Sequence, residues 1–231
     1  MATVPTTFDP LFARYGAPYG IPLQFLRALA WMESGLDPTN VTGGHIGLFQ
    51  PGKENLDDWD KAAKSAGYPI PAGSWRVRLT DPALNTRVFV RTLNSMMSSF
   101  KAGGLTPDWS WDDYPALLTM GWNAGWSQKQ GVRRVLDYLR GKGLPLDYST
   151  VAAWALDAGA KSTLSDGAKQ QWQRATVALF RHLETSPALP IPATVAARLQ
   201  AVKAALPGRV GDWGWLALLL GIIYLTDIKK W

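Results

Sequence analysis

One apolar segment of this chain ends in a carboxylate: Ile21-Pro-Leu-Gln-Phe-Leu-Arg-Ala-Leu-Ala-Trp-Met-Glu-Ser-Gly35. Its proline suits the first turn of a helix, and its final glycine suits a helix stop. Leu26 and Leu29 recur at spacings that share a helix face with Glu33, so the acid projects from an apolar face. Burial and the negative end of the helix dipole both disfavour the ionised carboxylate. We therefore expect a raised pKa for Glu33 and a proton available near neutral pH.

A lone glutamate at a helix end can also turn outward into solvent and do nothing. The next motif, Gly43-Gly-His-Ile-Gly-Leu-Phe-Gln50, favours a site instead. Its glycines allow positive φ and close backbone approach, and Gln50 ends an apolar triplet with an amide that donates and accepts hydrogen bonds. We expect this segment to line one wall of a cleft.

Two later motifs contain polar residues in apolar surroundings. In Asp81-Pro-Ala-Leu-Asn85, the aspartate and proline predict a helix start. Asn85 then falls on the apolar stripe of that helix, so we expect it to satisfy buried backbone groups. In Gly121-Trp-Asn-Ala-Gly125, an asparagine between small residues is placed to present its amide at a loop tip.

Taken in order, these motifs resemble the soluble lytic transglycosylase family, a branch of the lysozyme-like superfamily. The resemblance runs from about Tyr15 to Arg140, and a predicted helix at 170–183 is similar to the closing helix of the family. It implies that Glu33 is the single catalytic acid and base. It also implies substrate-binding roles at the cleft for the matching residues Ser34, Gly47, Gln50, Asn123 and Ala124.

The chain departs from the family pattern at two positions. Phe49 stands where the family has Met, and Trp122 stands where the family has a Tyr hydroxyl. An indole N–H donates a hydrogen bond but cannot accept one. Trp122 and Trp126 flank the asparagine turn, and we expect both to stack against sugar rings.

The number of candidate catalytic carboxylates bears on the reaction mechanism. Glycoside hydrolases ordinarily use two, yet the only other glutamates are Glu54 and Glu184, and Asp37 lies in a turn-like stretch. The resemblance implies a one-acid lyase, in which the muramoyl 6-hydroxyl closes a 1,6-anhydro ring as the MurNAc-GlcNAc β-1,4 bond breaks. The alternatives are a goose-type-like hydrolase that uses Asp37, and an inactive wall-binding or virion structural protein.

Composition limits the other classes of function. The chain has no cysteine, which removes disulfides and thiol nucleophiles, and only two histidines, so we expect no metal centre and no cofactor. The net charge of +6 favours approach to an anionic wall or lipid surface. Its basic residues are scattered and form no nucleic-acid-binding motif, so no nucleic acid partner is expected.

The C-terminal part of the chain changes in character. We expect a catalytic domain at 1–186, a proline-rich linker at 187–192, an amphipathic helix at 193–208 and a hydrophobic segment at 209–231. Its uncharged run at 213–226 is shorter than the ~20 residues of a usual span, and it predicts contact with membrane lipid or a buried helix.

The fold expected is mainly α, a lysozyme-like domain with a helical, membrane-associated tail and a small irregular or β element within 43–73. The partners expected are peptidoglycan glycan strands, lipid and other virion proteins. The first residues contain no signal-peptide pattern. We therefore expect a virion-associated or membrane-anchored enzyme that acts in the periplasm or cell wall and opens it locally during phage genome delivery.

Overall fold

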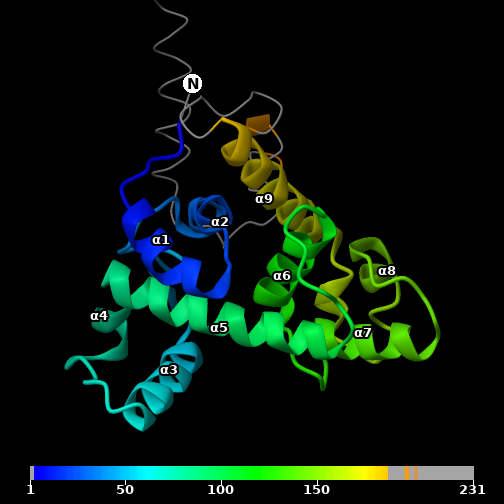
Figure 1. Ribbon diagram of the computed structural model, residues 1–231, viewed down its shortest axis with the longest axis horizontal. Coiled ribbons are helices and arrows are strands. Elements are labelled where there is room, and N and C mark those ends of the chain that lie inside the picture. The colour runs from blue at the N-terminus through cyan, green and yellow to red at the C-terminus, as the bar shows by residue number, and fades with distance from the viewer. Residues whose placement is uncertain (1–2, 187–195, 198–200, 202–231) are drawn as a thin grey trace, which may run out of the picture.

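The computed structural model of this chain describes residues 3–186, 196–197 and 201. This part is mainly helical, as predicted, and its one sheet is a two-stranded antiparallel hairpin (Figure 1). The elements are α1 (Asp9–Gly16), the 3-10 helix η1 (Ala17–Tyr19), α2 (Leu23–Ser34), β1 (Val41–Thr42), β2 (His45–Ile46), α3 (Lys53–Ser65), α4 (Trp75–Leu79), α5 (Pro82–Ala102), α6 (Asp113–Ala124), α7 (Val132–Gly141), α8 (Tyr148–Ala153), the 3-10 helix η2 (Ser162–Leu164) and α9 (Gly167–Thr185).

The longest helix, α5, crosses the molecule in Figure 1, with α1 and α2 on one side of it and α3 and α4 on the other. Its start is the one predicted, because Asp81 accepts a hydrogen bond from the backbone N–H of Leu84 at 2.6 Å and Pro82 opens the helix. A small apolar cluster joins α5 to the hairpin, α3 and α4. Its buried members are Ile46, Leu56, Trp59, Ala63, Leu79, Leu84 and Val88.

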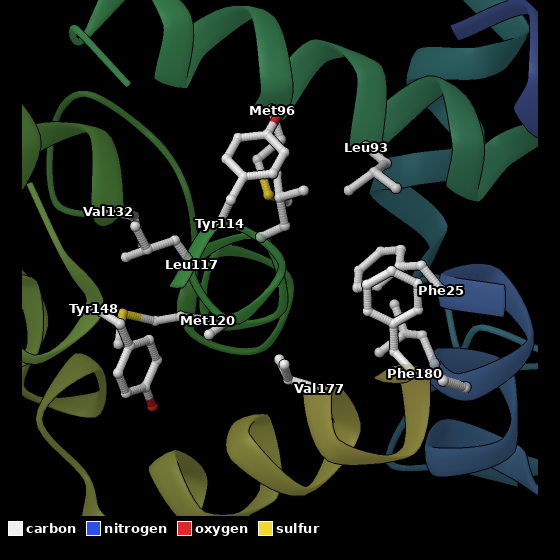
Figure 2. Close-up of a cluster of buried hydrophobic side chains, with 14 of the residues drawn as sticks. Phe25, Leu93, Met96, Tyr114, Leu117, Met120, Val132, Tyr148, Val177 and Phe180 are labelled. Carbon is white, nitrogen blue, oxygen red and sulfur yellow. The ribbon is translucent and has the colours of Figure 1, made fainter. Parts of the chain in front are cut away.

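The main core surrounds α6, which Figure 2 shows end-on between α5 and α9. Every residue of this helix from Tyr114 to Gly121 is buried. A helix that is apolar on all sides is stable only when other elements enclose it. Met96 of α5, Tyr148 of α8 and Val177 of α9 are among the side chains that do so (Figure 2). The C-terminal end of α6 is thereby held rigidly.

The segment that ends at Glu33 forms α2, as predicted. The helix begins after Pro22 and ends at Gly35, whose φ of 73° is the left-handed conformation that glycine adopts readily. Phe25 anchors the helix from its first turn, because its ring meets the edge of Phe180 of α9 at 5.7 Å. α2 is therefore fixed between α1 and α9, and Glu33 lies in its last turn.

Two predicted elements differ in detail. The expected irregular or β element at 43–73 is a hairpin that begins at Val41, followed by α3, a helix that the sequence did not predict. The predicted closing helix is α9, which extends beyond 170–183 at both ends.

The predicted linker, amphipathic helix and hydrophobic segment fall outside the described residues, apart from 196–197 and 201, which are helical. The predictions for these three segments therefore stay predictions. Within the described ranges, no helix combines the length and the apolar character that crossing a bilayer requires.

Candidate active site

A cleft of about 720 Å³ opens over the last turns of α2 and α6. This volume lies within the range of typical small-molecule sites. The hairpin, the first turn of α3 and the start of α9 complete its walls. The lining residues are Met32, Glu33, Thr42, Gly43, His45, Gln50, Glu54, Asn55, Gly121, Trp122, Asn123, Gly125, Trp126, Lys169 and Trp172.

Glu33 is the most strongly perturbed acid at this cleft. Burial of its carboxyl raises the pKa to about 8 from an ordinary value of 4.5. Hydrogen bonds from the side chains of Asn123 and Trp122 act in the opposite direction, because they stabilise the ionised form. Burial outweighs both, so Glu33 is mostly protonated at neutral pH, as the sequence predicts.

The two side chains that hold Glu33 come from the end of α6. The amide Nδ2 of Asn123 donates to Oε1 of Glu33 at 3.3 Å, across 90 positions of sequence. The Trp122 side chain also hydrogen-bonds the carboxyl, and its indole N–H can only donate. The indole therefore supplies one contact that a tyrosine hydroxyl could make, although it offers no acceptor. Oδ1 of Asn123, beside the acid, is buried and has no hydrogen-bond partner within the described part of the chain.

Both departures from the family pattern belong to one aromatic stack behind the acid. The rings of Phe49 and Phe89 are parallel, with 4.1 Å between centroids and an interplanar angle of 3°. Phe89 in turn meets Trp122 edge-on. The Phe at position 49 thus supports, through Phe89, the indole that stands in place of the tyrosine.

Gln50 is held in a specific orientation at the cleft wall. Its backbone has φ of 53°, a left-handed conformation that is uncommon for a residue other than glycine. The side-chain amide donates to the carbonyl oxygens of Gly47 at 2.7 Å and Asn40 at 3.1 Å. Both donors are thereby used, while Oε1 is buried and has no hydrogen-bond partner among the residues that the structure describes. The free oxygen is the group that can accept a hydrogen bond from a ligand.

Asn85 and Gly47 fix the conformation of the loop that carries Gln50. Asn85 donates to the carbonyls of Ile46 at 2.7 Å and Leu79 at 2.9 Å, and it accepts from the backbone N–H of Phe49 at 3.0 Å. This confirms the structural role predicted for it. A Cβ on Gly47 would lie 2.3 Å from Nδ2 of Asn85, so only glycine fits there.

Three residues assigned to the cleft by the resemblance do not line it. Ser34 is buried, and its hydroxyl donates to the carbonyl of Leu48 at 2.9 Å, which ties α2 to the loop. Gly47 packs against Asn85, and Ala124 is buried in the core. Their contribution in this geometry is to place Glu33, Gln50 and the end of α6.

The positions of Asp37 and Glu54 bear on whether a second carboxylate can take part in the reaction. Asp37 accepts hydrogen bonds from the backbone and hydroxyl of Thr39 at 2.8 and 2.7 Å, and it does not line the cleft. It is a turn residue, so the geometry does not support it as a second catalytic group. Glu54, in the first turn of α3, is the other carboxylate that reaches the cleft.

The structure adds cleft residues that sequence reasoning missed. Lys169 and Trp172 enter from α9, both nearly buried. The predicted match between α9 and a closing helix was the available signal, but it did not identify which helix face meets the cleft. Trp122 and Trp126 also line the cleft, and His45 is exposed at its rim.

The described residues contain no group of three or more His, Asp or Glu side chains placed to hold a metal ion.

Comparison with known proteins agrees with this geometry. The model of the transglycosylase SLT domain matches residues 10–135, which include Glu33, Gln50 and Asn123. No curated protein matches the chain. Lys169 and Trp172 lie beyond the matched region, in the helix that completes the cleft. The matched region spans more than half of the sequence, so the chain belongs to the SLT transglycosylase family, whose members are peptidoglycan lytic transglycosylases that break glycosidic bonds as lyases.

Proposed function

We propose that Glu33 is the single acid and base of a reaction that breaks the MurNAc-GlcNAc β-1,4 bond. The observation that carries the proposal is the carboxyl of Glu33, protonated at neutral pH and hydrogen-bonded to Asn123 in a cleft of about 720 Å³. A general acid is most effective when its pKa lies near the working pH.

In the first step, Glu33 gives its proton to the glycosidic oxygen, and the bond from that oxygen to C1 of the muramoyl residue breaks. The carboxylate that results is stabilised by the donors of Asn123 and Trp122. In the second step, the carboxylate removes the proton from the muramoyl 6-hydroxyl, and the oxygen of that hydroxyl bonds to C1 of the same sugar. The products are a 1,6-anhydromuramoyl end and a free hydroxyl on the leaving sugar, and Glu33 regains its proton.

The polar oxygens in the cleft support orientation of the sugar. Oε1 of Gln50 and Oδ1 of Asn123 are acceptors without protein partners, and sugar hydroxyl and acetamido groups are donors that can fill them. Trp126 and Trp172 offer apolar faces for the rings. A buried acceptor left unpaired costs about 1–3 kcal/mol, so pairing it with substrate favours binding.

The second candidate is a hydrolase, favoured by the position of Glu54 in the same cleft. In that reaction Glu54 would activate water, and the product would keep a reducing end. Mass spectrometry of soluble products from purified peptidoglycan separates the two. Anhydromuropeptides made by the wild type but not by Glu33→Gln would support the lyase, whereas reducing ends lost in Glu54→Gln would support the hydrolase. A wall-bound protein that forms neither product would be a binding module.

We also propose that the enzyme acts on the wall from a virion or a membrane, through residues 213–226. The support is the sequence alone: fourteen uncharged residues that include Trp213 and Trp215 and are followed by Lys229 and Lys230. The test is co-sedimentation with anionic vesicles of the full chain and of a chain that lacks residues 207–231. Equal sedimentation of the two would exclude membrane attachment through this segment, and absence of the protein from purified phage particles would exclude the virion role.

A further inference from the structure

A second groove, separate from the cleft, lies between the end of α1, the C-terminal half of α3 and the first half of α5. Its volume is about 260 Å³. We call it the arginine groove. Aromatic rings and arginines characterise it, namely Tyr15, Tyr19, Trp59, Tyr68, Arg87 and Arg91, and Val90 and three alanines also line it.

Arg87 is held at the centre of the groove by two rings. Its guanidinium carbon lies 5.0 Å from the ring centre of Trp59 and 5.8 Å from that of Tyr15. Such contacts fix the position of a guanidinium without using its N–H donors. Within the described part of the chain, Arg87 forms no hydrogen bond or ion pair. Its donors therefore remain available to an anion.

Arg91 adds a second positive charge one helical turn further along α5, and it too forms no ion pair with the residues described. Among the residues that the structure describes, no carboxylate lines the groove. The nearby acids of α3 have other partners: Asp57 pairs with Lys53, Asp58 with Lys61, and Asp60 with Arg78. The groove is thus an anion-attracting surface without an internal counter-ion.

The rings at its rim indicate what kind of anion fits. Tyr19 and Tyr68 are 47% and 61% exposed, so their ring faces are accessible to a ligand. Flat aromatic faces pack against the apolar faces of sugar rings, and arginine pairs with carboxylate in a two-pronged geometry. A sugar that carries carboxylates matches both features, whereas a neutral sugar or a small free anion matches only one.

We propose that the arginine groove is a second, non-catalytic site that binds a carboxylate-bearing muramyl peptide of the wall. The inference rests on the proposed function, since it takes the ligand from the same polymer. Helix α3 links the two sites: its first turn, with Glu54 and Asn55, lines the cleft, and its later turns, from Trp59, line the groove. A wall held at the groove is thereby kept beside the cleft.

The test measures binding by the full chain in the Glu33→Gln background, where no turnover occurs. Calorimetry with a soluble disaccharide tetrapeptide should show two classes of site. Adding Arg87→Gln and Arg91→Gln should weaken one class about tenfold or more and leave the other unchanged. The matched control is Arg76→Gln with Lys101→Gln. This control removes the same charge from exposed positions outside the groove. Arg76 resembles Arg87 in that its guanidinium carbon lies over a ring, 4.7 Å from the ring centre of Trp75.

Three outcomes overturn the proposal. The first is unchanged binding in the Arg87→Gln, Arg91→Gln variant, and the second is an equal loss of affinity in the control variant. The third is displacement of the tetrapeptide from the groove by inorganic phosphate at similar concentration, which would indicate a general anion site. A neutral N-acetylglucosamine oligomer should fill only the cleft class. Failure of the proposed function is distinguishable, because it would appear as missing anhydro products while the groove class of binding persists.

Discussion

The ring of Phe89 stands perpendicular to the indole of Trp122, at an interplanar angle of 90° with 4.8 Å between centroids. This edge-to-face contact positions the side chain that hydrogen-bonds Glu33. The pKa of the acid therefore depends on apolar packing behind the cleft as well as on its polar neighbours.

Replacing Trp122 by Phe should keep the packing but remove the indole donor. Because that hydrogen bond lowers the pKa of Glu33, its loss should move the alkaline limb of the pH–rate profile upward. The rate should fall about tenfold or more, because the carboxylate formed in the reaction loses a donor. Trp122→Tyr, which restores a donor, should recover most of the rate. Trp109→Phe controls for loss of an indole that packs on Phe25 away from the cleft; an equal effect there would contradict the assignment.

The wild-type enzyme should lose activity as pH rises above about 8. Burial raises the pKa of Glu33 to that value, and only the protonated form can donate to the glycosidic oxygen. The measurement is kcat/KM on soluble glycan strands across the range from acid to alkaline pH. An alkaline limb centred near 4.5, the ordinary value for a glutamate, would show that the acid is not perturbed in the free enzyme.

Replacing Asn123 by Ala should shift the same limb upward, because Nδ2 of Asn123 donates to Oε1 of Glu33 at 3.3 Å and favours the ionised form. The rate should fall about tenfold or more through loss of the donor. Asn123→Asp tests the sign: a second carboxylate beside Glu33 should raise its pKa further. A profile that does not move in either variant would remove the residue from the site.

Replacing Glu33 by Gln should stabilise the protein at high pH. The folded-state pKa of about 8 lies above the ordinary 4.5, so the folded form retains its proton where the unfolded form releases it. Wild-type stability should therefore fall as pH rises from about 4.5 to about 8 and level off above, by a few kcal/mol at most. Urea unfolding of both proteins at several pH values measures this, and a difference that is independent of pH would contradict it.

Replacing Asn85 by Ala should destabilise the fold by about 3 kcal/mol, because two carbonyls and one N–H would lose their partner in a buried place. Thermal unfolding is the measurement. Asn94→Ala, on the same helix but only partly buried, is the control and should change the melting temperature little. A similar loss in both would mean that helix propensity, not the buried hydrogen bonds, sets the cost.

Much of the site follows from local sequence. The helix that carries Glu33, its glycine stop, the start of α5 and the structural role of Asn85 are each coded by neighbouring residues, and all were predictable. The placement of Asp37 in a turn was also visible, although its exclusion from the cleft was not. Burial of Glu33 could be expected from the apolar face of its own helix.

The rest depends on contacts between distant segments. Lys169 enters the cleft because α9 packs across α2 and α6, which no local pattern encodes. Ser34 turns inward because its hydroxyl meets the carbonyl of Leu48, which lies fourteen residues along the chain. The arginine groove likewise combines three helices. Such long-range arrangements are set by packing, which a single sequence read locally does not reveal.

The contact of Phe25 with Phe180 also bears on synthesis of the chain. A ribosome releases α2 early, together with Glu33, but its packing partner α9 emerges about 150 residues later. Until α9 emerges, the cleft lacks the wall that Lys169 and Trp172 form. A chain arrested or cut before α9 thus carries Glu33, Gln50 and Asn123 but has an incomplete cleft, so the family motifs do not by themselves form the candidate active site.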